Sequence, residues 1–152
     1  MINNKRILGL IPARAGSKGI PNKNMVLFNG NPLIHWTIAA AQNSNYIDEI
    51  SVSTDDPIIQ NYAREKGCNA DVLRPCHLAT DSASSIDVIK EVLERQDDFD
   101  YVLLLQPTSP LRQSDDIDGC IVMAEHGGLQ SLISVTESKE HPLLAYEQLP
   151  TG

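Results

Sequence analysis

Residues 6–24 read RILGLIPARAGSKGIPNKN, and this stretch decides the expected fold. Its first part, Arg6 to Ile11, is a short apolar run that predicts a buried β-strand. The turn after it contains two glycines and three cations: Gly16, Gly19, Arg14, Lys18 and Lys23. Glycines let a turn bring its backbone N–H groups close to an anion, and the cations add positive charge. A strand followed by such a turn predicts a triphosphate-binding loop; the alternative is an ordinary strand-to-helix turn.

Outward from this loop, strand-like runs alternate with helix-period segments. Helices are predicted over 32–42, after the Asp56-Pro57 cap, after the serines of 81–85, and from Asp115-Asp116 to Gly127-Gly128. We expect two of these helices to turn the following side chains inward: Ile58, Ile59, Tyr62 and Ala63, and then Ile86, Ile89, Val92 and Leu93.

Strands are predicted at 49–53, 70–73, 101–105 and 131–135, with 101–105 apolar enough for the centre of a parallel sheet. The alternation predicts one doubly wound α/β domain with a mostly parallel sheet, Rossmann-like in type. Ligands of such sheets bind at the carboxyl ends of the strands, so the loops after Ile11, Ser53, Leu73 and Leu105 are the candidate sites.

Composition excludes several classes of protein. The 152 residues are 41% hydrophobic and 21% charged, which fits a single globular domain. No run approaches the ~20 apolar residues of a membrane span, and 7–11 is too short for a signal peptide. Three scattered cysteines without a CxxC pair argue against disulfides or structural zinc. We therefore expect a cytoplasmic protein, neither secreted nor in a membrane.

The charge is unevenly distributed. The net charge is −8, which makes nucleic acid an unsuitable partner. Residues 1–47 carry five basic and no acidic side chains, whereas the remainder carries seven basic and 20 acidic ones. This asymmetry predicts a local site for a small, multiply charged anion near the N-terminus; the alternative is a solvated surface.

The loop departs from two common nucleotide-binding patterns. It is not GxxxxGK[ST], which disfavours a Walker-type NTPase, and it is not GxGxxG, which disfavours a dinucleotide oxidoreductase.

Three ordered segments carry a specific resemblance. They are IPARAGSKGIPNKN at 11–24, LRPCHLATDSASS at 73–85 and LLQPTSPLR at 104–112, with VSTD at 52–55 between the first two. From Ile7 to about Pro142 the chain resembles the acylneuraminate cytidylyltransferases, the CMP-sialic acid (CMP-nonulosonic acid) synthetases. The resemblance implies a nucleotide-diphospho-sugar transferase type of fold. It also implies that the sugar-binding and dimerisation lobe is largely missing after about residue 140.

The resemblance implies roles for particular residues. CTP would be bound by Arg14, Ala15, Gly16, Ser17, Lys18, Lys23, Asn24, Arg74, Ala83 and Ser85, with the last three lining the cytosine and ribose pocket. The acceptor sugar would be contacted by Gln106, Arg112 and His141, and the catalytic residues would be Arg14, Lys23 and Gln106. Simpler alternatives stay open. Lys18 could point into solvent, Arg74 could form a surface ion pair, and Arg112 could support its loop. The serines Ser82, Ser84 and Ser85 could cap a helix.

The implied reaction transfers CMP from CTP to the anomeric hydroxyl of a nonulosonic acid and releases pyrophosphate. The resemblance implies a Mg²⁺ cofactor and a homodimer at full length. The metal ligands are not identified, and Asp55, Asp56 and Asp81 are the carboxylates to examine if the chain is active alone. Which acid is used (N-acetylneuraminate, legionaminate or pseudaminate) stays open. Two other hypotheses about the function remain open: a non-catalytic CTP-binding module and a sugar-1-phosphate nucleotidyltransferase of the same fold.

Overall fold

The main sheet is parallel and has its N-terminal strand in the middle. In a computed structural model that describes residues 2–16, 19–96 and 98–137, the sheet consists of β1 (Ile7–Pro12), β4 (Glu49–Ser53) and β5 (Tyr101–Leu104). The strand order is β4-β1-β5, and Leu10 pairs with Ser51 on one side and Leu104 on the other. Among the described strands the expected centre of the sheet was wrong, because β1 is central and β5 pairs only with β1.

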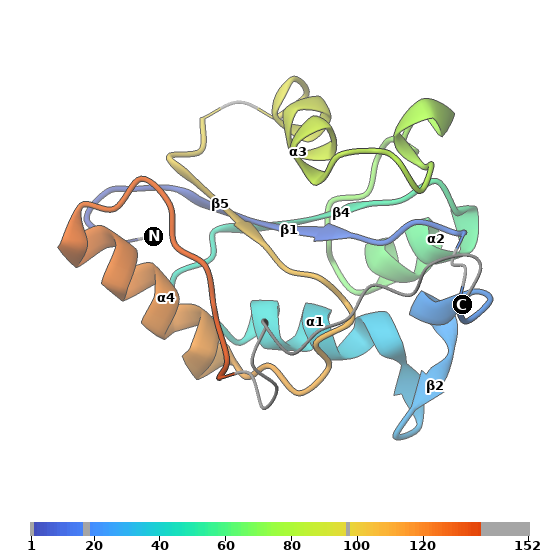
Figure 1. Cartoon of the computed structure of the whole chain (residues 1–152), viewed down its shortest axis with the longest axis horizontal. Helices are drawn as coiled ribbons and strands as arrows, with labels where there is room; N and C mark the ends of the chain where they lie inside the picture. Colours follow the sequence, from blue (N-terminus) through green and yellow to red (C-terminus); the bar gives the residue numbers. More distant parts are fainter. Residues whose placement is uncertain (1, 17–18, 97, 138–152) are drawn as a thin grey trace, which may run out of the picture.

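Helices connect and cover these strands (Figure 1). The α-helices are α1 (Leu33–Gln42), α2 (Pro57–Glu65), α3 (Ser85–Leu93) and α4 (Ser114–Gly127). Two short 3-10 turns, η1 (Lys23–Met25) and η2 (Cys76–Leu78), and a small hairpin of β2 (Leu27–Phe28) and β3 (Asn31–Pro32) complete the order.

Each face of the sheet has its own core, because successive side chains of a strand point to opposite faces. Ile7 and Ile11 of β1 belong to the larger core, with residues of α1, α2 and α4. Leu8 and Leu10 belong to the smaller core, with Val92 of α3. Figure 1 shows α3 on one side of the sheet and α1 and α4 on the other. Helices on both faces of a parallel sheet confirm the doubly wound α/β fold.

The helices begin and end where the sequence predicts. The Asp56 carboxylate accepts from the Ile58 N–H at 2.8 Å and caps α2, with Pro57 in its first turn. Ser84 Oγ accepts from the Ile86 N–H at 3.1 Å and caps α3. Gly128 ends α4 in the left-handed conformation, at φ 58°.

Two expected core residues lie outside the core. Ile58 is 66% exposed and Ile86 is 61% exposed. Neighbours in a helix are about 100° apart, so Ile58 and Ile59 cannot both face the sheet. In α2 the buried apolar pair is Ile59 and Ala63, which are four residues apart and lie on one face.

Two expected strands do not form. Residues 131–135 have no regular structure, and Ile133 and Val135 are 81% and 84% exposed. In the 70–73 region the pairing is a single bridge between Asn69 and Ser51. β-propensity depends on packing against a neighbouring strand, and the described residues supply no such neighbour for 131–135.

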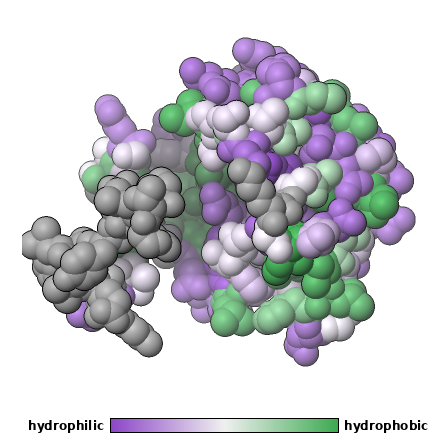
Figure 2. Space-filling model, turned by 45° about the vertical axis from the view of Figure 1, so that its right-hand side comes forward, coloured by the Kyte–Doolittle hydropathy of each residue, from purple (hydrophilic) through white to green (hydrophobic). Residues whose placement is uncertain are grey.

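Apolar side chains are also exposed around the β2–β3 hairpin, where Val26, Leu27 and Phe28 are 44%, 68% and 42% exposed. Figure 2 shows a largely hydrophilic face on which hydrophobic side chains gather along the lower edge. Within the described ranges, no helix has both the length and the apolar character needed to cross a membrane.

Candidate nucleotide-binding site

A cavity of about 240 Å³ lies beyond the carboxyl ends of β1 and β5. It is lined by the loop after β1, the segment from Arg74 to α3, and the loop after β5. Eight of the residues predicted for the site line it together: Arg14, Gly16, Lys23, Asn24, Arg74, Ala83, Ser85 and Gln106. Ser17, Lys18 and His141 lie outside the described residues.

The loop after β1 is held from two sides. The Asn24 amide, 7% exposed, donates to the Arg14 carbonyl at 3.0 Å. The Ala15 N–H donates to Asp55 Oδ1 at 2.8 Å. Ala15, predicted to bind CTP, is not among the residues that line the cavity, and its N–H is bonded to Asp55 in this structure. These two bonds fix the backbone from which Arg14 and Lys23 reach the cavity.

Arg74 is buried and hydrogen-bonded to two neighbouring segments, and with the described residues it does not form the surface ion pair that was the alternative. It is 5% exposed, and its Nε donates to Ser53 Oγ at 2.9 Å. Its Nη2 donates to the Ser53 carbonyl, and its Nη1 to the Leu78 carbonyl at 3.5 Å. Burial lowers the pKa of the guanidinium, while the Coulombic field of Asp55 opposes that shift. Arg74 therefore joins the end of β4 to η2 while lining the cavity.

Arg14 is ion-paired across the cavity. Its Nη2 contacts Asp81 Oδ1, and the two side chains are 33% and 41% exposed. The pair joins the loop after β1 to the segment before α3, and both residues line the cavity.

Arg112 supports the neighbouring loop. Its Nη2 donates to the Gln106 carbonyl at 3.3 Å, and its Nη1 is buried without a hydrogen-bond partner among the described residues. Burial lowers the pKa of this guanidinium. Arg112 is not among the residues that line the cavity, whereas Gln106 is. The structure therefore shows the loop support that the sequence left as an alternative, and the sugar contact of Arg112 stays a prediction.

Several residues that line the cavity were not predicted from the sequence, and the sequence did not show which of the three serines caps the helix. Leu78, Thr80 and Thr108 line the cavity and were not predicted. The available signal was their position inside the second and third motifs, next to predicted residues. Of the serines, Ser84 is the helix cap, Ser85 lines the cavity, and Ser82 Oγ lies 3.2 Å from Thr80 Oγ1.

The three candidate metal-ligating carboxylates are engaged in other contacts. Asp55 accepts from the Ala15 N–H, Asp56 caps α2, and Asp81 pairs with Arg14. The described part of the chain contains no group of three or more His, Cys, Asp or Glu side chains arranged for a metal ion. These residues therefore do not fit a protein-built Mg²⁺ site.

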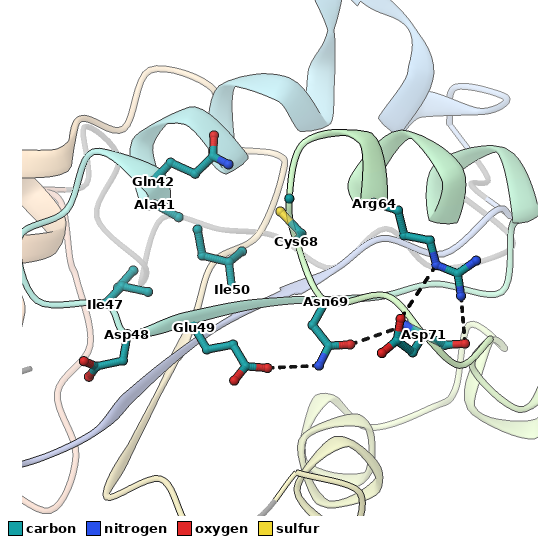
Figure 3. A pocket seen from close by; sticks show the side chains of 11 residues that line it. Ala41, Gln42, Ile47, Asp48, Glu49, Ile50, Arg64, Cys68, Asn69 and Asp71 are labelled. Carbon is teal, nitrogen blue, oxygen red and sulfur yellow. Dashed lines mark hydrogen bonds and ion pairs between the residues drawn. The ribbon is translucent and has the colours of Figure 1, made fainter.

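A larger cavity, of about 650 Å³, lies at the amino end of β4 (Figure 3). Several of its polar side chains already have hydrogen-bond partners within the cavity lining. Asn69 donates to Glu49 Oε1 at 2.9 Å, and Arg64 donates to the Asp71 carbonyl at 2.9 Å. Parallel sheets bind ligands at their carboxyl ends, so the smaller cavity is the better candidate.

A parallel α/β sheet with a cation-bearing glycine loop at its carboxyl edge is an arrangement typical of phosphate-binding proteins. Residues 8–145 match the cytidylyltransferase family, and the chain belongs to that family. This match confirms the family resemblance carried by the three motifs.

Relatives and solved structures agree with the match. An N-acylneuraminate cytidylyltransferase of Streptococcus agalactiae is 39% identical over 137 residues, which cover 89% of this chain and 33% of the relative. A CMP-N,N'-diacetyllegionaminic acid synthase of Legionella pneumophila is 44% identical over 135 residues, or 86% of this chain and 58% of the relative. A CMP:2-keto-3-deoxy-manno-octonic acid synthetase, solved in complex with CTP, superimposes with a TM-score of 0.71 at 25% identity. That superposition covers 82% of this chain and 49% of the other. The chain thus spans about a third of the Streptococcus relative.

Proposed function

We propose that this chain is the CTP-binding part of a cytidylyltransferase that acts on a sialic-type nonulosonic acid. The observation that carries the proposal is the convergence of three motif segments on one cavity at the carboxyl end of the sheet. Arg14 and Lys23 come from the first segment, Ala83 and Ser85 from the second, and Gln106 from the third.

The proposed chemistry needs positive charge and positioning rather than a protein nucleophile. The anomeric hydroxyl oxygen of the sugar attacks the α-phosphorus of CTP, and the bond from that phosphorus to the bridging oxygen breaks as pyrophosphate leaves. The hydroxyl proton passes to solvent or a base. Arg14 and Lys23 would stabilise the negative charge that grows on the phosphate oxygens. Gln106, which lines the same cavity, would hold the attacking hydroxyl in line.

We also propose a metal cofactor, an oligomeric state and a cellular location for the whole protein. Mg²⁺ would enter with the triphosphate, which binds it in solution. The complete protein would be a homodimer. A cytoplasmic location is supported by the three cysteines, Cys68, Cys76 and Cys120, which are all free thiols.

Nucleotide titration is the direct test. We expect isothermal titration to show tighter binding of CTP than of ATP or GTP, because we assign the part of the cavity lined by Ala83 and Ser85 to a pyrimidine base. UTP tests the discrimination between the two pyrimidines. Equal affinity for CTP and ATP would contradict the pocket assignment and favour a general phosphate-binding module.

Turnover separates the enzyme from a non-catalytic CTP-binding module. A pyrophosphate-release assay with CTP, Mg²⁺ and N-acetylneuraminate should show little activity of this chain alone, because its described residues offer no metal-binding carboxylate cluster. Loss of one stabilising element costs ~10²–10³ in rate. A rate near the ~10 s⁻¹ typical of enzymes would contradict this expectation.

A further inference from the structure

The ion pair between Arg14 and Asp81 lies inside the candidate site. The lining of the cavity includes three cations, Arg14, Lys23 and Arg74, and among its described residues Asp81 is the one carboxylate. Arg74 already bonds Ser53 and the Leu78 carbonyl. Arg14 and Lys23 are therefore the cations best placed to meet an anionic ligand, and Asp81 occupies one of them.

We propose that Asp81 is an internal competitor of the nucleotide, holding the Arg14 guanidinium until a triphosphate displaces it. This inference rests on the proposed function, because it assumes that Arg14 binds phosphate. Both partners are one-third or more exposed, so solvent screens their attraction and the pair is weak enough to exchange. A triphosphate carries several negative charges, and phosphate oxygens suit the guanidinium fork as well as a carboxylate does.

The exchange also couples two parts of the site. Arg14 and Asp81 are 67 residues apart, and their pair is a direct link between the loop after β1 and the segment before α3. Displacement of Asp81 breaks this link, whereas two bonds of the loop backbone have other partners. They run from Asn24 to the Arg14 carbonyl and from the Ala15 N–H to Asp55. The loop therefore keeps its backbone anchors while the Arg14 side chain changes partner.

Substitution of Asp81 tests the competition. In Asp81→Asn the rival charge is lost, so the Kd for CTP, measured by titration in EDTA, should fall about two- to fivefold. Asp71→Asn is the matched control, since it removes the same charge from an exposed side chain that lines the other cavity and pairs with Arg64. The control should leave the Kd for CTP unchanged. An unchanged or weaker affinity in Asp81→Asn would overturn the proposal.

A double-mutant cycle tests whether the gain in CTP affinity depends on Arg14. In the Arg14→Ala background there is no guanidinium to compete for, so the added Asp81→Asn change should shift the Kd by less than twofold. The same gain in both backgrounds would show a general charge effect and overturn the proposal. Melting curves of each variant verify that the fold is intact.

Tripolyphosphate, used as a second probe, separates this inference from the proposed function. If Asp81→Asn tightens tripolyphosphate but the parent binds CTP no better than ATP, the proposed function fails and the competition stands. If the parent prefers CTP and Asp81→Asn gains nothing with either probe, the competition fails and the function stands. If neither probe binds to the parent or to Asp81→Asn, both fail.

Discussion

Two arginines show that a buried guanidinium group bonds to the protein backbone and is less available to a ligand. Arg74 and Arg112 both carry predicted ligand contacts, yet each donates to backbone carbonyls in the structure. Burying a guanidinium is costly unless its N–H groups find acceptors, so these side chains bond the nearest main-chain oxygens. The cations that remain accessible in the cavity, Arg14 and Lys23, are accordingly those that we assign to phosphate.

Lys23→Ala should weaken CTP binding by about 2 kcal/mol, the scale of a charge-assisted hydrogen bond. The melting temperature should barely change, because Lys23 has no ion pair to lose among the described residues. Isothermal titration measures the affinity. Lys66→Ala is the control, since it removes the same side chain from an exposed position at the end of α2. Equal affinity of Lys23→Ala and the parent would contradict the role of the loop.

Cys68 should be the least reactive of the three thiols. Burial raises its pKa to about 11, so at pH 8 it is a neutral, shielded thiol, whereas Cys76 is exposed. Alkylation at pH 8 followed by mass spectrometry should label Cys76 first and Cys68 last. Rapid labelling of Cys68 in the folded protein would contradict its burial.

The same pKa shift makes stability depend on pH. The neutral thiol is favoured by the fold, so its contribution is complete below the unfolded pKa, near 9, and is lost as the pH rises through about 11. The free energy of unfolding of the parent should therefore fall more steeply between pH 9 and 11 than that of Cys68→Ala. Urea titrations across this range measure the difference, and parallel curves would contradict it.

At the scale of the element, α2 shows how one helix divides its isoleucines. Ile58 and Ile59 are adjacent in sequence, but Ile59 is 1% exposed and Ile58 is 66% exposed. The helix is amphipathic, and its Asp56 cap sets where the first turn begins. The direction in which the sheet lies then decides which of the two is buried.

This division predicts unequal effects of the same substitution. Ile59→Ala should lower the free energy of unfolding by about 2–5 kcal/mol, because it removes buried methyl groups and leaves a cavity. Ile58→Ala, its matched neighbour, should change the free energy by no more than about 0.5 kcal/mol. Urea denaturation with an unchanged m-value measures both. Similar losses in the two variants would contradict the observed face of the helix.

At the scale of the whole molecule, one edge strand of the main sheet has a single strand partner within the described residues. β5 pairs only with β1 among the described strands, and the exposed Ile133 and Val135 follow α4 nearby in the chain. Unpaired strand edges and exposed apolar side chains promote contacts between molecules.

We therefore expect this chain to self-associate as its concentration rises. Ile133→Lys and Val135→Lys should each reduce the association, because a charge disfavours apolar contact. Ile58→Lys, which changes an exposed isoleucine on α2, is the control and should leave it unaltered. Analytical ultracentrifugation over a range of concentrations measures the effect. A monomer at every concentration, or equal effects of all three variants, would contradict the prediction.

The sequence alone determined the four α-helices, the three strands of the main sheet and their order. Local signals suffice for this: the apolar run of β1, the Asp56 and Ser84 caps, and Gly128 at the end of α4 act within a few residues. The three motifs also identified eight of the residues that line the cavity, because short motifs preserve the chemical types needed at a binding site.

Only the tertiary structure decided which strand is central, which isoleucine of α2 is buried, and which cations remain accessible. Each depends on a neighbour that is distant in sequence: β4 and β5 beside β1, the sheet beneath α2, and Ser53 beside Arg74. The Arg14–Asp81 pair likewise joins residues 67 positions apart. Local propensity carries no information about such partners, and hydrogen bonding and burial are satisfied only when the chain has brought them together.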